Sequence, residues 1–218
     1  MNETIQAIIF DMDGTMVDNM AVHNRIWVEF FAEMGIQLDL AAFNARTAGR
    51  TNPEVLRIYL GDDLGAQQLQ QLGEEKEVRY RAFFAAHARP VAGLHDLLHA
   101  ARQAGYRLGV ATAAPARNVD FMLGCLHLDN FFDVVVNGED VTHGKPDPEI
   151  FLKAAERLGV SPAACLVFED ARMGVEAAHR AGMRAMLVTT SIPADEAKDI
   201  PGVIKVIADF NEVIADFI

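Results

Sequence analysis

The sequence predicts an α/β fold, in which a doubly wound, parallel, Rossmann-like sheet carries an all-helical cap inserted after its first strand. After residue 90, short apolar runs alternate with helical patterns, which is typical of a parallel sheet covered by helices on both faces. Residues 17–89 contain helical patterns and no strand of comparable strength. We therefore expect a core domain of residues 1–16 and 90–218 and a cap domain of residues 17–89.

The predicted strands are short apolar runs of the kind found in buried parallel sheets. They lie at residues 7–10, 106–112, 132–137, 165–168, 184–189 and 203–208. Helical patterns separate the later strands, at residues 95–104, 116–127, 148–158 and 172–181. Asp147 followed by Pro148 is a favourable helix start, and Gly159 and Gly182 are favourable helix ends.

The cap block contains three helical patterns. Residues 23–34 are amphipathic, a second helix begins at Asn52, where Pro53 suits the first turn, and a third covers residues 74–86. The alternative is that these helices only cover the sheet, and the length of the contiguous block favours a cap. We expect its joints with the core near residues 16–19 and 89–93.

Composition and charge exclude some classes of protein. The 218 residues carry a formal net charge of −12, which argues against a nucleic-acid partner because phosphate backbones require basic surfaces. No apolar stretch reaches membrane-spanning length, no secretory signal is visible, and the two cysteines lack the spacing of metal ligands. We expect a cytoplasmic protein, a monomer or weak dimer, with neither a nucleic acid nor a membrane as partner.

Two carboxylates follow the first predicted strand. Residues 11–15 read DMDGT and come directly after the apolar run 7–10, at the strand end where open α/β sheets bind ligands. Asp11 and Asp13 can hold a hard cation, or one can attack an electrophile while the other moves a proton. Gly14 permits a sharp turn and a close approach to a ligand. An Asx-rich turn without further role is the alternative for these five residues alone.

Polar groups also follow later strands. Thr112 ends the second strand, where its hydroxyl and the backbone N–H of Ala113 can bind a phosphoryl oxygen; an ordinary capping threonine is the alternative. Lys145 lies in the segment 144–148 (GKPDP), whose prolines hold it on a rigid turn. A fixed ammonium can neutralise a transferring phosphoryl group, whereas a solvated lysine is the alternative.

Glu169 and Asp170 follow the apolar run 166–168. Two acids in that position are costly unless they are paired or bind a metal, although they can also complement a helix dipole. Together with Asp11 and Asp13, Asp170 would complete an oxygen cage for Mg²⁺. A cation of this kind suits an acidic protein that handles phosphate.

The motifs are far more specific in combination. The order DxDGT, Thr, GKPDP and ED-x₃-G along alternating strands resembles the haloacid dehalogenase-like superfamily of phosphotransferases. The resemblance spans essentially the whole chain, and the helical insertion looks like the first cap type of that superfamily. Within it, the chain is most similar to sugar-phosphate phosphatases and β-phosphoglucomutase-like proteins.

The resemblance implies roles for the acidic residues. Asp11 would be the nucleophile that forms an aspartyl-phosphate, and Asp13 the general acid/base. Mg²⁺ would be held by the carboxylates of Asp11 and Asp170 and by the backbone carbonyl of Asp13, with Glu169 at or just outside that shell. The aspartate at position 13 favours phosphate chemistry, because superfamily members that remove halide lack it.

The resemblance also implies that Thr112 and Lys145 grip the phosphoryl group. Substrate choice would come from the cap, through His23, Arg50 and Lys76. His23 is expected to contact substrate as the cap closes or else to be a surface histidine, and Arg50 to reach a phosphate or sugar hydroxyl or else to be solvated. Lys76 matches a basic position in mutase-like and phosphatase relatives alike.

The sequence thus predicts a Mg²⁺-dependent phosphatase that acts on a small phosphorylated metabolite, with a sugar phosphate as the favoured class. A phosphomutase that uses the same intermediate is one alternative. In β-phosphoglucomutases the cap arginine follows Gly-Val-Ser, whereas residues 49–52 read GRTN here, which favours a hydrolase. A catalytically idle phosphometabolite-binding protein is the other alternative, although neither the nucleophile nor a metal ligand is lost.

Overall fold

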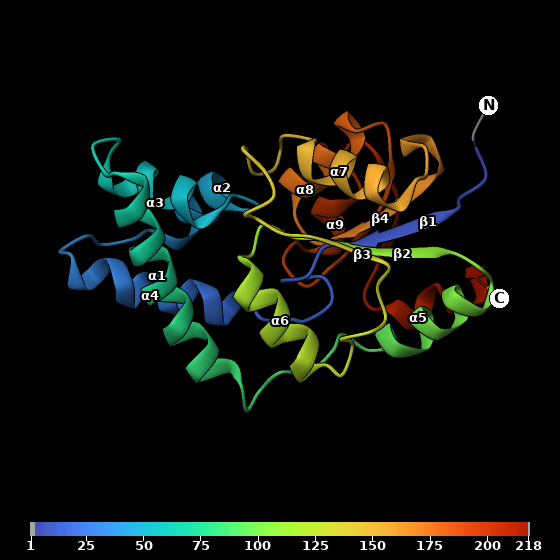
Figure 1. Ribbon diagram of the computed structural model, residues 1–218, viewed down its shortest axis with the longest axis horizontal. Coiled ribbons are helices and arrows are strands. Elements are labelled where there is room, and N and C mark those ends of the chain that lie inside the picture. The colour runs from blue at the N-terminus through green and yellow to red at the C-terminus, as the bar shows by residue number, and fades with distance from the viewer. Residues whose placement is uncertain (1–2, 218) are drawn as a thin grey trace.

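The computed structural model describes residues 3–217 and contains a parallel sheet in the order β3-β2-β1-β4-β5-β6 (Figure 1). The strands are β1 (Ala7–Phe10), β2 (Arg107–Ala111), β3 (Val134–Val136), β4 (Cys165–Glu169), β5 (Arg184–Val188) and β6 (Val203–Ile207). All six predicted strands are present, several of them shorter at their ends. The central strand β1 pairs with β2 on one side and with β4 on the other, so the ends of these three strands are neighbours.

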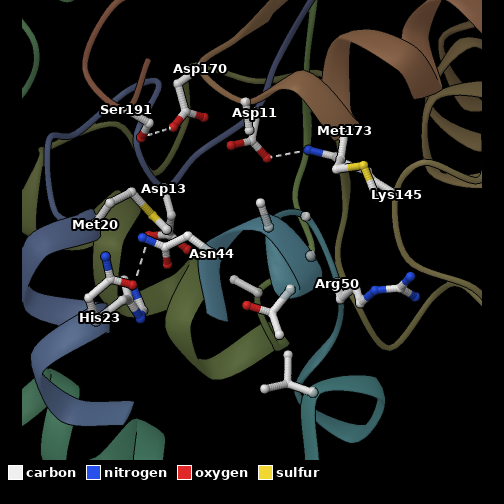
Figure 2. Close-up of a pocket in the computed structure, with 18 of the residues that line it drawn as sticks. Asp11, Asp13, Met20, His23, Asn44, Arg50, Lys145, Asp170, Met173 and Ser191 are labelled. Atoms are coloured by element: carbon white, nitrogen blue, oxygen red, sulfur yellow. Dashed lines mark hydrogen bonds and ion pairs between the residues drawn. The ribbon is translucent and has the colours of Figure 1, made fainter. Parts of the chain in front are cut away.

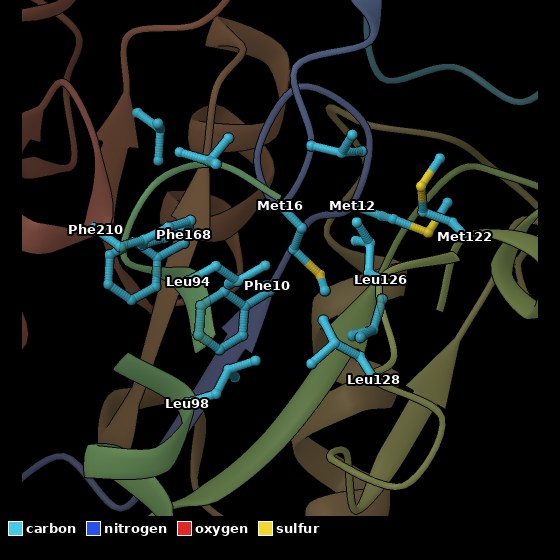
Figure 3. Close-up of a cluster of buried hydrophobic side chains, with 14 of the residues drawn as sticks. Phe10, Met12, Met16, Leu94, Leu98, Met122, Leu126, Leu128, Phe168 and Phe210 are labelled. Atoms are coloured by element: carbon cyan, nitrogen blue, oxygen red, sulfur yellow. The ribbon is translucent and has the colours of Figure 1, made fainter. Parts of the chain in front are cut away.

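Helices cover both faces of the sheet, as predicted. Ile8 and Phe10 of β1 pack in one buried cluster with side chains of α5 (Leu94–Gln103) and α6 (Ala116–Cys125), and Figure 3 shows Phe10 among its neighbours. Ala7 and Ile9 point to the opposite face, into a cluster with α7 (Glu149–Leu158) and α8 (Arg172–Arg180). Because both faces of β1 are buried, it reads as an unbroken apolar run.

Short elements complete the core. They are the helix α9 (Ala194–Ala197) and the 3₁₀ turns Pro162–Ala164, Phe210–Glu212 and Ile214–Phe217. No helix within residues 3–217 combines the length and the apolar character needed to cross a membrane.

The cap helices, as we call α1–α4, lie between β1 and α5 in the chain and form a group beside the sheet in Figure 1. They are α1 (Met20–Glu33), α2 (Leu40–Thr47), α3 (Asn52–Leu60) and α4 (Ala66–Phe84). They share an apolar cluster of their own, made by Trp27, Phe30, Phe31, Phe43, Val55, Leu56 and Leu69. The helical nature of the block is as expected, and the domain boundaries at residues 16/17 and 89/90 stay a prediction.

Two chain segments connect the cap helices to the core, and these segments lie side by side. The backbone N–H of Val91 donates to the carbonyl oxygen of Met16 at 2.9 Å, and Val17 and Pro90 form an isolated antiparallel bridge. These contacts lie at the joints expected near residues 16–19 and 89–93.

The prediction for the last cap helix was wrong at its start, because α4 begins at Ala66 rather than at residue 74. Its first turns are rich in glutamine, and Leu69 is their only buried apolar residue before Gly73, so they show little amphipathic pattern. Gly73 continues the helix at the point where α4 meets α3. A Cβ there would lie 3.3 Å from Cβ of Asn52, so the missing side chain permits close packing.

Candidate active site

The predicted site residues of the core meet at the carboxyl ends of β1, β2 and β4. Asp11 follows β1 and Thr112 follows β2. Glu169 is the last residue of β4, and Asp170 follows it. They lie against a cavity of about 830 Å³ whose other wall comes from the cap helices. Figure 2 shows Asp11 and Asp170 on the core side of this cavity and His23 on the cap side.

The centre of the site is an acidic cluster around a buried lysine. Carboxylate oxygens of Asp11, Glu169 and Asp170 lie within 4.8 Å of one another, and all three residues are buried. The ammonium of Lys145, only 1% exposed, donates to Asp11 Oδ1 and to Glu169 Oε1, each at 2.6 Å. Lys145 is therefore an integral part of the site, and the alternative of a solvated lysine is wrong.

The balance of charge in this cluster favours a cation. Burial, together with the negative charge of Glu169, raises the pKa of Asp11 to about 7 despite the attraction of Lys145. Burial, Glu169 and Asp11 likewise hold the pKa of Asp170 well above its usual range. A divalent cation among these oxygens would remove that penalty, so the residues present fit a metal ion such as Mg²⁺.

Asp170 is held by close contacts from two loops. Thr15 Oγ1 donates to Asp170 Oδ1 at 3.1 Å, and the hydroxyl of Ser191 donates to Asp170 Oδ2. Gly14 has a φ of 85°, and a Cβ there would lie only 2.0 Å from Asp170 Oδ2. The glycine of DxDGT therefore allows the backbone after β1 to come up against Asp170.

Glu169 joins Lys145 to the start of α8. Its Oε1 accepts from Lys145, and its Oε2 accepts from the backbone N–H groups of Asp170 and Ala171 at 2.9 Å each. A Cβ on Gly174 would overlap the carboxylate, at 1.8 Å from Oε1. The glycine of ED-x₃-G thus leaves the space that the Glu169 carboxylate fills.

Asp13 is turned toward the cap helices and stands apart from the acidic cluster. Asn19 Nδ2 donates to Asp13 Oδ1 at 2.6 Å, while Asn19 Oδ1 accepts from the N–H of Gly14 at 3.0 Å. His23 Nε2 lies 3.6 Å from the same Oδ1. The side chain of Asp13 is thereby placed to face a group bound in the cavity, and ligation of metal by its backbone carbonyl stays a prediction.

His23 and Lys76, both predicted from the sequence, lie together in the cap. His23 is 8% exposed, so it is not a surface histidine. Lys76 Nζ lies 2.8 Å from His23 Nδ1 and 2.8 Å from Glu77 Oε1. Because an ammonium only donates, Nδ1 of His23 accepts, and its ring proton is on Nε2, facing Asp13.

The remaining predicted residues also line the cavity, with different contacts. Thr112 Oγ1 accepts from the N–H of Ala114 at 3.1 Å, which leaves the hydroxyl proton to donate into the cavity beside Ala113. Arg50 donates through Nε to the carbonyl oxygen of Arg46 at 2.9 Å. Its guanidinium points away from Asp13 and His23 in Figure 2, and substrate binding by Arg50 stays a prediction.

The comparison with protein families agrees with this geometry. Residues 5–182 match the model of the haloacid dehalogenase-like hydrolases. The chain belongs to this family.

Relatives within the family are named as phosphatases. The putative phosphatase YhcW of Bacillus subtilis is 35% identical over 86% of this chain and 85% of its own length. The fructose-1-phosphate phosphatase YqaB of Escherichia coli is 33% identical over 85% of this chain and 97% of its own. These similarities confirm the family and the hydrolase class predicted from the four motifs.

Solved structures of the haloacid dehalogenase-like family share the whole fold. A family IA, variant 3 hydrolase from Entamoeba histolytica has a TM-score of 0.85 and 28% identity, and the match covers 98% of this chain and 99% of that one. A β-phosphoglucomutase from Clostridium difficile has a TM-score of 0.82 and 26% identity, with 96% and 93% covered. The fold is thus common to hydrolases and mutases of the family.

Three residues of this hydrolase site were not predicted from the sequence. Ser191 follows β5, so the rule that ligand-binding residues follow strand ends would have found it had it been applied to that strand. Asn19 lies in the first joint, where no pattern marks it. Glu77 had no signal in the sequence, because a glutamate on a helix is most often solvated and its burial depends on packing.

Proposed function

We propose that the chain is a Mg²⁺-dependent phosphatase that releases phosphate from a small phosphorylated metabolite, and that a sugar monophosphate is its substrate class. The observation that carries the proposal is a buried Asp11 carboxylate held between Lys145 and Asp170, with Asp13 facing the same cavity. The printed names of two relatives support the substrate class, namely the fructose-1-phosphate phosphatase and a phosphorylated carbohydrates phosphatase of Thermotoga maritima, 31% identical over 82% of this chain.

In the first step, Asp11 attacks the phosphorus atom. Lys145 binds Oδ1 of Asp11 and so leaves Oδ2 for an in-line approach. The Oδ2–P bond forms while the bond from phosphorus to the sugar oxygen breaks, and Asp13 donates the proton that the leaving oxygen requires. Asp11 and Asp170 would hold Mg²⁺, which would supply positive charge to offset the repulsion between carboxylate and phosphoryl group.

In the second step, water hydrolyses the aspartyl-phosphate. Asp13, now deprotonated, takes a proton from a water molecule, which attacks phosphorus and frees Asp11 and inorganic phosphate. Asn19 and His23 orient Asp13 for both transfers, since Asn19 contacts its carboxylate at 2.6 Å and His23 faces it at 3.6 Å. Thr112 and the N–H of Ala113 stabilise the phosphoryl oxygens from the end of β2.

The cap contacts support hydrolysis rather than mutase activity. A mutase must also hold a second phosphate, which calls for cations on the cap side of the cavity. Lys76 is engaged by Glu77 and His23, and Arg50 by the carbonyl oxygen of Arg46 and, at 3.7 Å, by Glu54. These two cations are therefore already partnered within the protein.

The test is a panel of sugar monophosphates incubated with Mg²⁺, with free phosphate and sugar isomers both measured. We expect phosphate release, loss of activity with a chelator, and inhibition by Ca²⁺, whose larger coordination shell loosens the in-line geometry. Isomer formation without net phosphate release, in the presence of a sugar bisphosphate, would show a mutase instead. Full activity in the chelator would remove the metal from the mechanism.

A further inference from the structure

We propose that Glu77 of α4 and Asn118 of α6 form a buried hydrogen bond that holds the cap closed over the site and keeps Lys76 and His23 in place. The kinetic consequence of this latch rests on the proposed function, whereas its effect on cap closure does not. Asn118 contacts α4 and is not among the residues that line the cavity, so it acts as a positioning residue.

The cap is closed in this structure. The loop after α2 reaches the core, where the backbone N–H of Lys145 donates to the carbonyl oxygen of Gly49 at 3.0 Å. Next to it, the N–H of Gly144 donates to Glu54 Oε1 at 3.1 Å. A Cβ on Gly49 would lie 2.9 Å from Cβ of Lys145, so cap and core are in direct contact at the catalytic lysine.

A second seam between cap and core joins α4 to α6, which Figure 1 shows next to each other. Asn118 Nδ2 donates to Glu77 Oε2 at 2.6 Å, and the two residues are 1% and 2% exposed. Arg81 donates to Asn118 Oδ1 at 2.5 Å. Arg81 thereby fixes the carboxamide of Asn118 with its oxygen toward the guanidinium and its NH₂ group toward Glu77.

The Glu77 carboxylate accepts hydrogen bonds from two residues of the cap and from Asn118 of the core. Glu77 Oε1 accepts from Lys76 Nζ and from Asn52 Nδ2, both at 2.8 Å, and these donors belong to the cap. Burial would raise the pKa of Glu77, but the charge of Lys76 and the hydrogen bonds to the carboxylate lower it to about 2, so the carboxylate is ionised. Opening the seam would separate this anion from Asn118, and a buried charge that loses a donor is strongly disfavoured until water reaches it.

Glu77 connects this seam to the catalytic groups. Its carboxylate holds Lys76, whose ammonium lies 2.8 Å from His23 Nδ1, and the opposite nitrogen of His23 faces Asp13 at 3.6 Å. His23 also stacks on Tyr80 of α4, with ring centroids 3.8 Å apart. A displacement of α4 from α6 would therefore move the cap groups that face Asp13.

A reciprocal exchange of the two side-chain groups tests the latch. Asn118→Asp sets two carboxylates against each other, and Glu77→Gln sets two NH₂ groups against each other. In the double variant the new amide at position 77 donates to the new carboxylate at position 118, so one hydrogen bond returns with reversed polarity. Its amide oxygen can still accept from Lys76, and Arg81 can still donate to the other oxygen at position 118.

Arg117→Ala is the matched control. Arg117 spans the same boundary next to Asn118 and contacts Glu74 at 2.8 Å, but its side chain is 74% exposed. Exposed ion pairs contribute little, so this variant should keep the cap closed and leave activity unchanged.

Trp27 provides a readout that does not depend on catalysis. It is the single tryptophan of the chain, and Lys76 Nζ lies 4.8 Å from the centre of its ring. We expect acrylamide to quench Trp27 more strongly in both single variants than in wild type, with recovery in the double variant. For a sugar phosphate, kcat/KM should fall about tenfold or more in each single variant and recover largely in the double variant.

Unchanged quenching in folded single variants, or a double variant no better than either single one, would overturn the latch. Circular dichroism establishes folding, and if Asn118→Asp does not fold, Asn118→Ala removes the same donor without adding a charge and should show the same increase in quenching. If wild type hydrolyses no sugar phosphate, the proposed function fails, while the quenching measurements still decide the latch.

Discussion

Gly14→Ala should damage the site far more than it damages the fold. Gly14 has a φ of 85°, in the left-handed region, and a Cβ at this position would lie 2.0 Å from Asp170 Oδ2. The substitution therefore has two effects, backbone strain and a clash with the group proposed to bind metal. Gly35→Ala separates them, because Gly35 has a similar φ of 79° and nothing lies within 4 Å of its added Cβ.

The strain should be similar in the two variants. A left-handed conformation costs an alanine roughly 1–2 kcal/mol. For a protein of this size, each kcal/mol lowers Tm by about 2–4 °C, so each variant should lose roughly 2–8 °C. We expect Gly35→Ala to show this loss with unchanged activity.

The clash affects Gly14→Ala alone. Asp170 Oδ2 and the new Cβ must move apart by at least 1.0 Å to reach 3.0 Å, below which Cβ contacts essentially do not occur. A displacement of this size at a catalytic group costs on the order of a hundredfold in rate. Moving Asp170 should also weaken metal binding, so the Mg²⁺ concentration for half-maximal activity should rise.

The assay compares wild type and the two variants in thermal unfolding and in phosphate release over a Mg²⁺ titration. We expect both variants to lose Tm through strain, with a further loss in Gly14→Ala from the clash, and a loss of activity in Gly14→Ala only. If Gly14→Ala keeps wild-type kcat/KM and Mg²⁺ dependence, the close approach of Gly14 to Asp170 has no role in the site.

Three further predictions concern individual charges. Asp11→Asn should stay folded, since the change is nearly isosteric, but retain less than about 1% of phosphatase activity, and more would contradict a covalent intermediate. If Arg50 binds the sugar, as the sequence predicts, Arg50→Ala should lower kcat/KM more for a sugar phosphate than for an aryl phosphate, whereas Lys145→Ala should lower both alike; equal losses in Arg50→Ala would remove it from substrate binding. The pKa of Glu77 is lowered from 4.5 to about 2, so its ionised form stabilises the fold above pH 4.5 and this stabilisation is lost as pH falls toward 2. The Tm difference between wild type and Glu77→Gln should therefore shrink over that range, and a constant difference would contradict an ionised Glu77.

The fold class and the meeting of most core site residues follow from the sequence alone. Asp11, Thr112, Glu169 and Asp170 each stand at the end of an apolar run, and the carboxyl ends of parallel strands meet at one edge of a sheet. Their meeting therefore follows from local patterns and one general rule. The prolines next to Lys145 similarly marked a fixed lysine, which the structure places between Asp11 and Glu169.

How the cap meets this site depends on packing that the sequence patterns do not show. Glu77 and Asn118 are 41 residues apart and belong to helices whose sequence patterns carry no sign of pairing. Their hydrogen bond exists because α4 packs on α6, and the start of α4 itself was missed where apolar periodicity is weak. A glutamate and an asparagine on helices look like solvated residues in a sequence. Burial makes them costly to leave unpaired, and burial is a property of the packed molecule.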